Sequence, residues 1–150
     1  MRLSHYLIPR IVGPLTLFVD DYVFVNPVNN SEGGVAYFVA KVLEIRADGP
    51  TCVYVRVYWM YWPEELPMSR QSYHGASELV ASNDMVIIDA MTIADRAVVS
   101  RIAETEDNAP PMEGLYWRQN YDILEHTLSV RLLFVHKKNI LLTILRLPSL

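Results

Sequence analysis

Strict alternation is clearest between Val53 and Tyr61, where apolar and polar side chains succeed one another in a stretch rich in strand-forming residues. Because successive side chains of a strand point to opposite sides, Trp59 and Tyr61 share a face with the valines that precede them. Pro63 follows, and it cannot donate a backbone hydrogen bond to a neighbouring strand. The pattern therefore predicts a strand that ends in aromatic residues at the rim of a sheet, where ligands commonly bind.

The rest of the chain shows short apolar stretches separated by turn signals, and few patterns long enough for a helix. Such spacing predicts an all-β fold, a distorted small β-barrel with short helical turns and irregular termini. The expected strands are Leu15–Val25 (a pair broken at Asp20 and Asp21), Val35–Arg46, Val53–Tyr61, Glu78–Ser82, Met85–Ile93, Ala97–Ile102 and Leu115–Leu128, the last ending in a helical turn. The expected loops are 26–34, 47–50 and 104–113.

A chain of 150 residues is long enough for one domain with its own core, which we place at residues 15–128. Residues 1–14 form an irregular N-terminal segment without the features of a signal peptide. Residues 129–150 form an atypical C-terminal extension, apolar at both ends and interrupted by a polar stretch at 136–139. Neither half could cross a bilayer, so we expect it to pack on the domain or to lack stable structure, with no membrane association.

Charge and cysteine content exclude several classes of function. A formal net charge of −4 and a sequence pI near 5.5 argue against a broad phosphate-binding surface, so we expect no direct sequence-specific DNA binding. The single cysteine, Cys52, excludes an intramolecular disulfide and a multi-thiolate zinc site, and the four histidines are too dispersed for a metal site. Cys52, His74 and Asp89 match no spacing that positions a nucleophile. We therefore expect no catalytic residue, no metal and no cofactor.

The aromatic residues have two interpretations. From the alternation alone, burial of Trp59 and Tyr61 in the core is favoured over a ligand site. Glu64 and Glu65 follow Pro63, where adjacent carboxylates are more often a solvated turn than part of a site. His74, between Tyr73 and Gly75, is most simply a turn residue whose imidazole makes a local hydrogen bond.

The order of the motifs resembles the bromo-adjacent homology (BAH) domain, in particular the form that fungal and plant proteins join to a PHD finger. The resemblance covers roughly residues 15 to 128 and is strongest from Trp59 to Ile93. Its motifs are Asp21-Tyr22-Val23-Phe24-Val25, Phe38-Val39-Ala40-Lys41-Val42, Val55-Arg56-Val57-Tyr58-Trp59-Met60-Tyr61-Trp62-Pro63-Glu64-Glu65, Arg70-Gln71-Ser72-Tyr73-His74-Gly75-Ala76-Ser77-Glu78-Leu79, Ser82-Asn83 and Ile87-Ile88-Asp89-Ala90-Met91-Thr92-Ile93.

This resemblance implies a nuclear chromatin module that binds histone tails or other chromatin proteins and is not an enzyme. In relatives that read the Polycomb mark, a trimethylated lysine of the histone H3 tail, an aromatic cage takes one ring from the second strand and two from a Trp-x-Tyr pair. The matching residues here are Phe38, Trp59 and Tyr61. A trimethylammonium group keeps its charge but has no hydrogen to donate, so ring faces are what can hold it.

Other residues are candidates for contact with the H3 peptide: Tyr37, Glu64, Glu65, His74 and Asp84. The chain departs from those relatives in having Phe38 where most have tyrosine, and Asp84-Met85-Val86 where they carry histidine and then aspartate. With one cysteine it cannot form their cysteine-rich zinc finger. The alternative function is a nuclear protein-interaction scaffold, with the aromatic residues buried and no recognition of methyl-lysine.

Overall fold

The structure is a computed structural model that describes residues 15–27, 37–49, 51–102 and 113–129 in full, and the backbone of four strand segments at 2–3, 5–8, 130–136 and 139–148. The chain divides into two compact units. The first contains Met1–Met60 and Met85–Val98, and the second contains Tyr61–Asp84 and Val99–Leu150. Strands β6 and β7 carry residues of both units, because the chain passes from one unit to the other within them.

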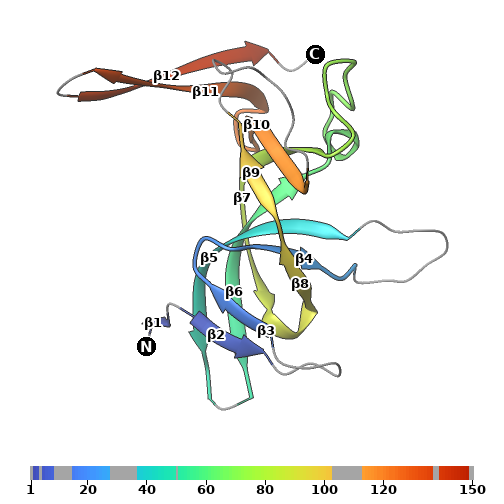
Figure 1. Ribbon diagram of the computed structural model, residues 1–150, viewed down its shortest axis with the longest axis vertical. Helices are drawn as coiled ribbons and strands as arrows, with labels where there is room; N and C mark the ends of the chain where they lie inside the picture. Colours follow the sequence, from blue (N-terminus) through green and yellow to red (C-terminus); the bar gives the residue numbers. More distant parts are fainter. Residues whose placement is uncertain are drawn as a thin grey trace. The chain divides into compact units, whose positions relative to one another are not determined.

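The first unit is built on a sheet with strand order β8-β4-β5-β6-β7, with β1 also paired to β5 (Figure 1). Its strands are β1 (Arg2–Leu3), β4 (Tyr22–Val25), β5 (Phe38–Ala47), β6 (Val53–Tyr61, up to Met60), β7 (Glu78–Asp89, from Met85) and β8 (Ile93–Ala97), and a 3-10 turn, η2 (Ala90–Thr92), precedes β8. Strands β2 (His5–Ile8) and β3 (Leu15–Phe18) form a separate antiparallel pair.

A β-bulge in the long β5–β6 hairpin sets which side chains face the core. Val42 pairs with Val57, but the next pair is Glu44 with Arg56, so Leu43 is the additional residue. The shift turns Ile45 and Val55, which pair with each other, into the core, where both are completely buried. Around them the core consists of apolar residues from neighbouring strands: Leu15, Leu17, Val23, Val25, Ala40, Val42, Val53, Val57, Ala90 and Ile93.

The second unit is organised around β10, which runs parallel to both β7 and β9 and antiparallel to β11. Its elements are η1 (Pro63–Glu65), the first part of β7, β9 (Val99–Arg101), β10 (Leu115–Asp122), β11 (Thr127–His136) and β12 (Asn139–Pro148). Its buried cluster contains Leu66, Val80, Tyr121 and Leu128. The backbones of β11 and β12 pair antiparallel along their whole length, with Thr127 opposite Pro148 and His136 opposite Asn139.

The predicted all-β class is confirmed: the described elements are strands and two 3-10 turns, η1 and η2. Among the described strands, the pairings follow an open path within each unit and do not close it into a barrel. No helix among the described residues is long and apolar enough to span a membrane.

Several predicted boundaries hold, and one break was wrong. The break expected at Asn83 and Asp84 does not exist, because β7 runs without interruption from Glu78 to Asp89. Both polar side chains instead bond to other segments, Asn83 Oδ1 accepting from the Ile123 backbone amide at 2.9 Å and Asp84 accepting from the Tyr61 hydroxyl. Parts of two predicted loops, at 28–34 and 104–112, and the start of the strand predicted from Val35 lie outside the described residues.

Candidate functional site

Strand β6 positions the aromatic pair that the sequence singles out. Val55 and Val57 are completely buried, as the alternation predicts, and Trp59 and Tyr61 continue that side of the strand but are only half-buried. Trp59 lies opposite Ala40 in the ladder with β5. The strand ends at Tyr61, and Pro63 begins the η1 turn. Both side chains are therefore partly buried and partly exposed.

Phe38 and Trp59 are brought together by the β5–β6 ladder. Because Ala40 pairs with Trp59, Phe38 is the diagonal neighbour of Trp59 on the same face of the sheet. Their ring centroids are 5.9 Å apart, and the ring planes meet at 62°. Both pack against the buried core of the first unit while keeping part of their surface exposed. Two rings set edge to face in this way form two walls of a corner.

Tyr37, the residue directly before β5, contacts a different ring. Its ring lies 5.9 Å from that of Phe24, with a tilt of 54°, and the side chain is 49% exposed. Tyr37 and Phe38 therefore belong to different ring pairs. The structure places Phe38, and not Tyr37, against Trp59.

Tyr61 and Asp84 are joined by a hydrogen bond in the second unit, in which the Tyr61 hydroxyl donates to Asp84 Oδ2. Burial, followed by this hydrogen bond and the charge of Asp84, raises the pKa of the Tyr61 hydroxyl. The ring also packs against the cluster of Leu66, Val80, Tyr121 and Leu128. A neutral hydroxyl anchored at its far end and a ring packed along one side hold Tyr61 in a defined orientation.

In the turn after β6, both glutamate carboxylates bond to groups of the same chain. Glu65 Oε2 accepts a hydrogen bond of 2.8 Å from the Trp62 backbone amide, and burial raises the pKa of the Glu65 carboxyl. Glu64 forms an ion pair with Arg70, whose hydrogen bond lowers the pKa of the Glu64 carboxyl. Glu64 and Glu65 are both exposed as residues, but the Glu65 carboxyl is partly buried.

His74 is buried and bonded at both ring nitrogens. The Gln71 backbone amide donates to Nδ1 at 2.9 Å, so the ring proton lies on Nε2, which is 2.8 Å from Gln119 Oε1. The local hydrogen bond that the sequence predicts for this histidine is present. Gly75 is required beside it for space, since a Cβ there would lie 2.0 Å from the Tyr116 hydroxyl.

One buried ion pair was not predicted from the sequence. Glu78 is completely buried, and its carboxylate accepts hydrogen bonds from Arg118 Nε and Nη2, both at 2.8 Å, and from the Gly75 amide at 2.9 Å. Arg118 lies 40 residues away in sequence, so no local pattern could reveal the pair. The three-residue offset between Gly75 and Glu78 was the only signal, and it predicts no more than a turn.

The polar side chains near the aromatic residues, the carboxylates and the histidine, have partners within the chain. Among the described residues, no group of three or more His, Cys, Asp or Glu side chains is placed to hold a metal ion. What remains available is ring surface next to a carboxylate, and such a combination attracts cations.

Comparison with known proteins agrees with this picture. Residues 15–144 match the family model described as the BAH domain. Over 79 residues, 53% of this chain, the sequence is 37% identical to the Chromatin remodeling protein EBS of Arabidopsis thaliana. That match covers 32% of the relative, so the chain spans about a third of its length.

The structural comparison shows the same fold. The chain is similar to the crystal structure of the yeast Rsc2 BAH domain, with a TM-score of 0.65 and 12% sequence identity, over 87% of this chain and 54% of that one. The family model matches most of the chain, and the motifs from Asp21 to Ile93 resemble the same family. The chain therefore belongs to the BAH domain family.

Proposed function

We propose that this chain is a chromatin reader module that binds a trimethylated lysine of the histone H3 tail, the Polycomb-type repressive mark. The methylammonium group would be held in an aromatic cage of Phe38, Trp59 and Tyr61. The chain would act in the nucleus on the H3 tail or the nucleosome in transcriptional silencing, by binding and without a reaction. The name of the Arabidopsis relative, a chromatin remodeling protein, supports a chromatin partner.

The observation that carries the proposal is the corner formed by Phe38 and Trp59. Rings with centroids 5.9 Å apart and planes at 62° present two faces at an angle, and both side chains remain half-exposed. A methylated ammonium is attracted to the negative face of each ring. Such contacts contribute on the order of 2 kcal/mol or more of binding free energy for a desolvated cation. Complete burial of either ring would have excluded this use.

Tyr61 supports the proposal as the third ring. It follows Trp59 by two positions in β6, so both side chains leave the strand on the same side. Its hydroxyl is bound to Asp84, which fixes the ring and brings a carboxylate to it. A negative charge next to a cage wall adds a Coulombic attraction for a cation that does not depend on hydrogen bonding.

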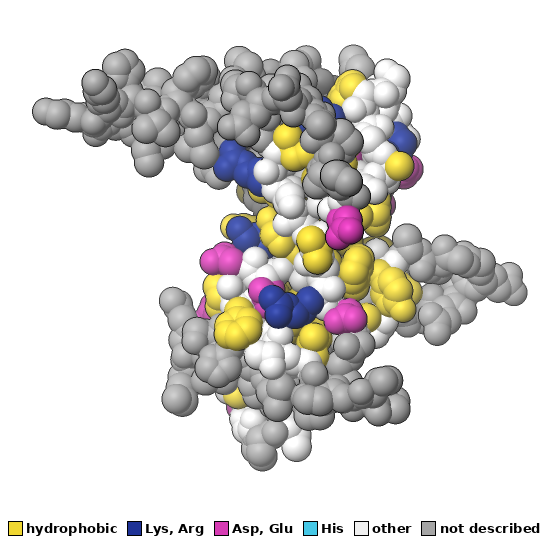
Figure 2. Space-filling view, in the orientation of Figure 1, with side chains coloured by type: hydrophobic (Ala, Val, Ile, Leu, Met, Phe, Trp, Pro, Cys, Tyr) yellow, Lys and Arg dark blue, Asp and Glu magenta, His cyan; other side chains and the backbone are white. Residues whose placement is uncertain are grey.

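The distribution of charge favours a basic peptide over DNA. The chain carries 17 acidic and 13 basic residues, and on the face that Figure 2 shows, Lys and Arg side chains are interspersed with Asp and Glu. A duplex is bound by clustered basic side chains that replace its counterions. A histone tail is basic, and an acidic protein attracts it.

Titration of H3-tail peptides tests the proposal directly. Peptides unmodified or mono-, di- or trimethylated at each candidate lysine are added to the chain, and binding is followed by calorimetry. We expect affinity to rise with methylation at one lysine. Trp59→Ala should abolish this rise, while Tyr54→Ala, on the opposite side of β6, should leave it intact. Equal affinity for methylated and unmethylated peptides would rule out an aromatic cage for methyl-lysine.

The alternative is a protein-interaction scaffold that does not recognise methyl-lysine. It is favoured by the packing of Phe38 and Trp59 against the buried core of the first unit, since the chain itself covers part of each ring. In that case Trp59→Ala would lower the stability of the domain and leave peptide binding independent of methylation. The same titration therefore separates the two functions.

A further inference from the structure

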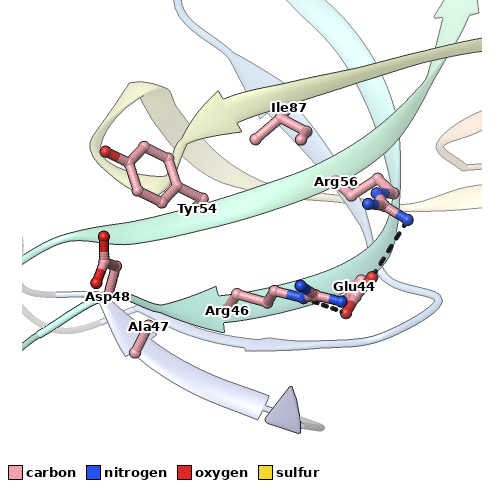
Figure 3. A pocket seen from close by; sticks show the side chains of 7 residues that line it. All are labelled: Glu44, Arg46, Ala47, Asp48, Tyr54, Arg56 and Ile87. Carbon is pink, nitrogen blue, oxygen red and sulfur yellow. Dashed lines mark hydrogen bonds and ion pairs between the residues drawn. The ribbon is translucent and has the colours of Figure 1, made fainter. Parts of the chain in front are cut away.

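A second concave surface lies on the first unit, on the side of β6 opposite to Trp59. It is a pocket of about 530 Å³, a size typical of ligand sites. Strands β5, β6 and β7 and the turn after β5 supply its lining, as Figure 3 shows: Glu44, Arg46, Ala47, Asp48, Tyr54, Arg56 and Ile87. None of these residues takes part in the proposed cage.

The pocket is formed by the β-bulge at Leu43. The bulge puts Glu44 opposite Arg56 and Arg46 opposite Tyr54, so two cross-strand pairs, on either side of the core-facing pair of Ile45 and Val55, turn charged or aromatic side chains to the same side. Without the extra residue, Glu44 would fall opposite Val55, on the side of the core. Bulges commonly re-aim side chains at functional positions.

Two guanidinium groups converge on one buried carboxylate in this pocket. Arg46 Nε donates to Glu44 Oε1, and Arg56 Nη1 lies 3.4 Å from Glu44 Oε2. Glu44 is buried, whereas the Arg46 and Arg56 side chains are 62% and 38% exposed. Among the described residues, Glu44 is the only ionic partner of either arginine. At this end of the pocket two positive charges face one negative charge, and both guanidinium side chains are partly exposed. With Asp48 the whole lining is formally neutral, so the positive charge is confined to the end formed by Arg46, Arg56 and Glu44.

The remainder of the pocket is apolar at its centre and acidic at the far end. Ile87 is 60% exposed and Tyr54 is 43% exposed, so both offer apolar surface to a ligand. In Figure 3, Asp48 lies beside Tyr54 at the end away from Glu44 and Arg56. An oxyanion would be attracted to the arginines, an apolar group to Ile87 and Tyr54, and a second anion would be repelled by Asp48.

We propose that this pocket is a second peptide-binding site, which takes a single acidic side chain and a neighbouring apolar side chain from a protein partner. Arg46 and Arg56 bind the oxyanion, and Glu44 holds the two guanidinium groups in place before the partner arrives. Ile87 and Tyr54 receive the apolar neighbour. Asp48 excludes polyanions such as nucleic acid, so the partner segment is amphiphilic rather than a run of acidic residues.

A titration with short probe peptides tests the site. The isotopically labelled chain is observed by nuclear magnetic resonance while acetyl-Leu-Glu-Leu-amide, its Gln analogue or its phosphoserine analogue is added. We expect the Glu probe to shift the Nε–H signals of Arg46 and Arg56 and the amide signal of Ile87, and the neutral Gln probe to bind about fivefold more weakly or worse. Tighter binding of the phosphoserine probe would assign the oxyanion to a phosphorylated side chain, and tighter binding of the Glu probe would assign it to a carboxylate.

Variants give the control. Arg46→Gln should weaken binding of the acidic probe, whereas Arg96→Gln, the same change at an exposed arginine of the first unit that pairs with Asp21, should not. Trp59→Ala should leave probe binding unchanged, so failure of the methyl-lysine cage and failure of this pocket can be told apart. The proposal is overturned if the Gln probe binds as well as the Glu probe, or if no probe shifts the Arg46 and Arg56 signals.

Discussion

Arg118 donates two hydrogen bonds to the completely buried carboxylate of Glu78, from two nitrogens that each lie 2.8 Å from a carboxylate oxygen. A buried ion pair of this kind is costly to break on one side, because the remaining charge has lost its solvent and its partner. We expect Arg118→Gln to lower the free energy of unfolding by about 3 kcal/mol or more. Lys41→Gln, which removes the exposed pair with Asp20 at 3.7 Å, should cost less than about 1 kcal/mol. Urea denaturation measures both, and equal effects would contradict a structural role for Glu78.

Gly75 tests the packing of the same region. A Cβ at this position would lie 2.0 Å from the Tyr116 hydroxyl and 3.2 Å from its Cζ, so the ring must move to accommodate it. We expect Gly75→Ala to destabilise the chain by about 1–3 kcal/mol, as overpacking does. Tyr116→Phe removes the clashing oxygen, so the double variant should recover part of the loss. Additive costs in a double-mutant cycle would show that the two residues do not meet.

The Tyr61 hydroxyl predicts a dependence of stability on alkaline pH. Its pKa in the folded chain lies above the ordinary value of 10.0, because of burial and then the hydrogen bond to Asp84. The folded state therefore keeps a proton that the unfolded chain releases above that value. The resulting contribution is fully present below the ordinary pKa and is lost as the pH rises toward the folded pKa.

We expect the chain to lose more stability between about pH 9 and pH 11 than Tyr61→Phe does. Urea denaturation at both pH values measures the difference, and comparison with the variant removes the effect of the other tyrosines. Parallel losses in the two proteins would mean that the pKa of the Tyr61 hydroxyl is not raised in the folded chain. Asp84→Asn should bring the chain closer to the behaviour of Tyr61→Phe.

Phe38 and Tyr37 provide a matched pair within the proposed cage. Phe38→Ala removes a wall that contacts Trp59, whereas Tyr37→Ala removes a ring that contacts Phe24 instead. We expect the first change to weaken binding of the trimethylated H3 peptide by about tenfold or more, since one cation–π wall contributes roughly 1 kcal/mol or more. The second should change it little. Calorimetric titration measures both, and a larger effect of Tyr37→Ala would move the cage to the other face of β5.

Local pattern predicted much of the fold, whereas the choice of Phe38, Trp59 and Tyr61 as cage residues came from the resemblance to the BAH family and stays a prediction. The alternation in β6 predicted that Val55 and Val57 are buried. The contact of Phe38 with Trp59 depends also on the register of β5 against β6, which alternation does not fix. The break at Asn83 and Asp84 was wrongly predicted because adjacent polar residues are typical of a turn, and the sequence does not show that their bonding partners lie in distant segments. Those partners, the Ile123 amide and the Tyr61 hydroxyl, are 40 and 23 residues away.

The bulge at Leu43 and the Glu78–Arg118 ion pair could also not be predicted from the sequence. A bulge changes which residues face the core without changing the composition of the strand, so Glu44 and Ile45 could not be assigned to sides in advance. The buried ion pair depends on the parallel packing of β7 against β10, which no local signal specifies. In both cases the missing information is strand register.

The central claim is that ring faces hold a positive charge, and a neutral analogue of the ligand tests it most directly. The trimethylated H3 peptide is compared with a peptide in which a carbon atom replaces the side-chain nitrogen, so that shape is kept and charge is lost. By calorimetry we predict that the charged peptide binds more tightly by about 2 kcal/mol, roughly thirtyfold. Equal affinity of the two peptides would contradict the account, because it would show that Phe38, Trp59 and Tyr61 recognise bulk and not a cation.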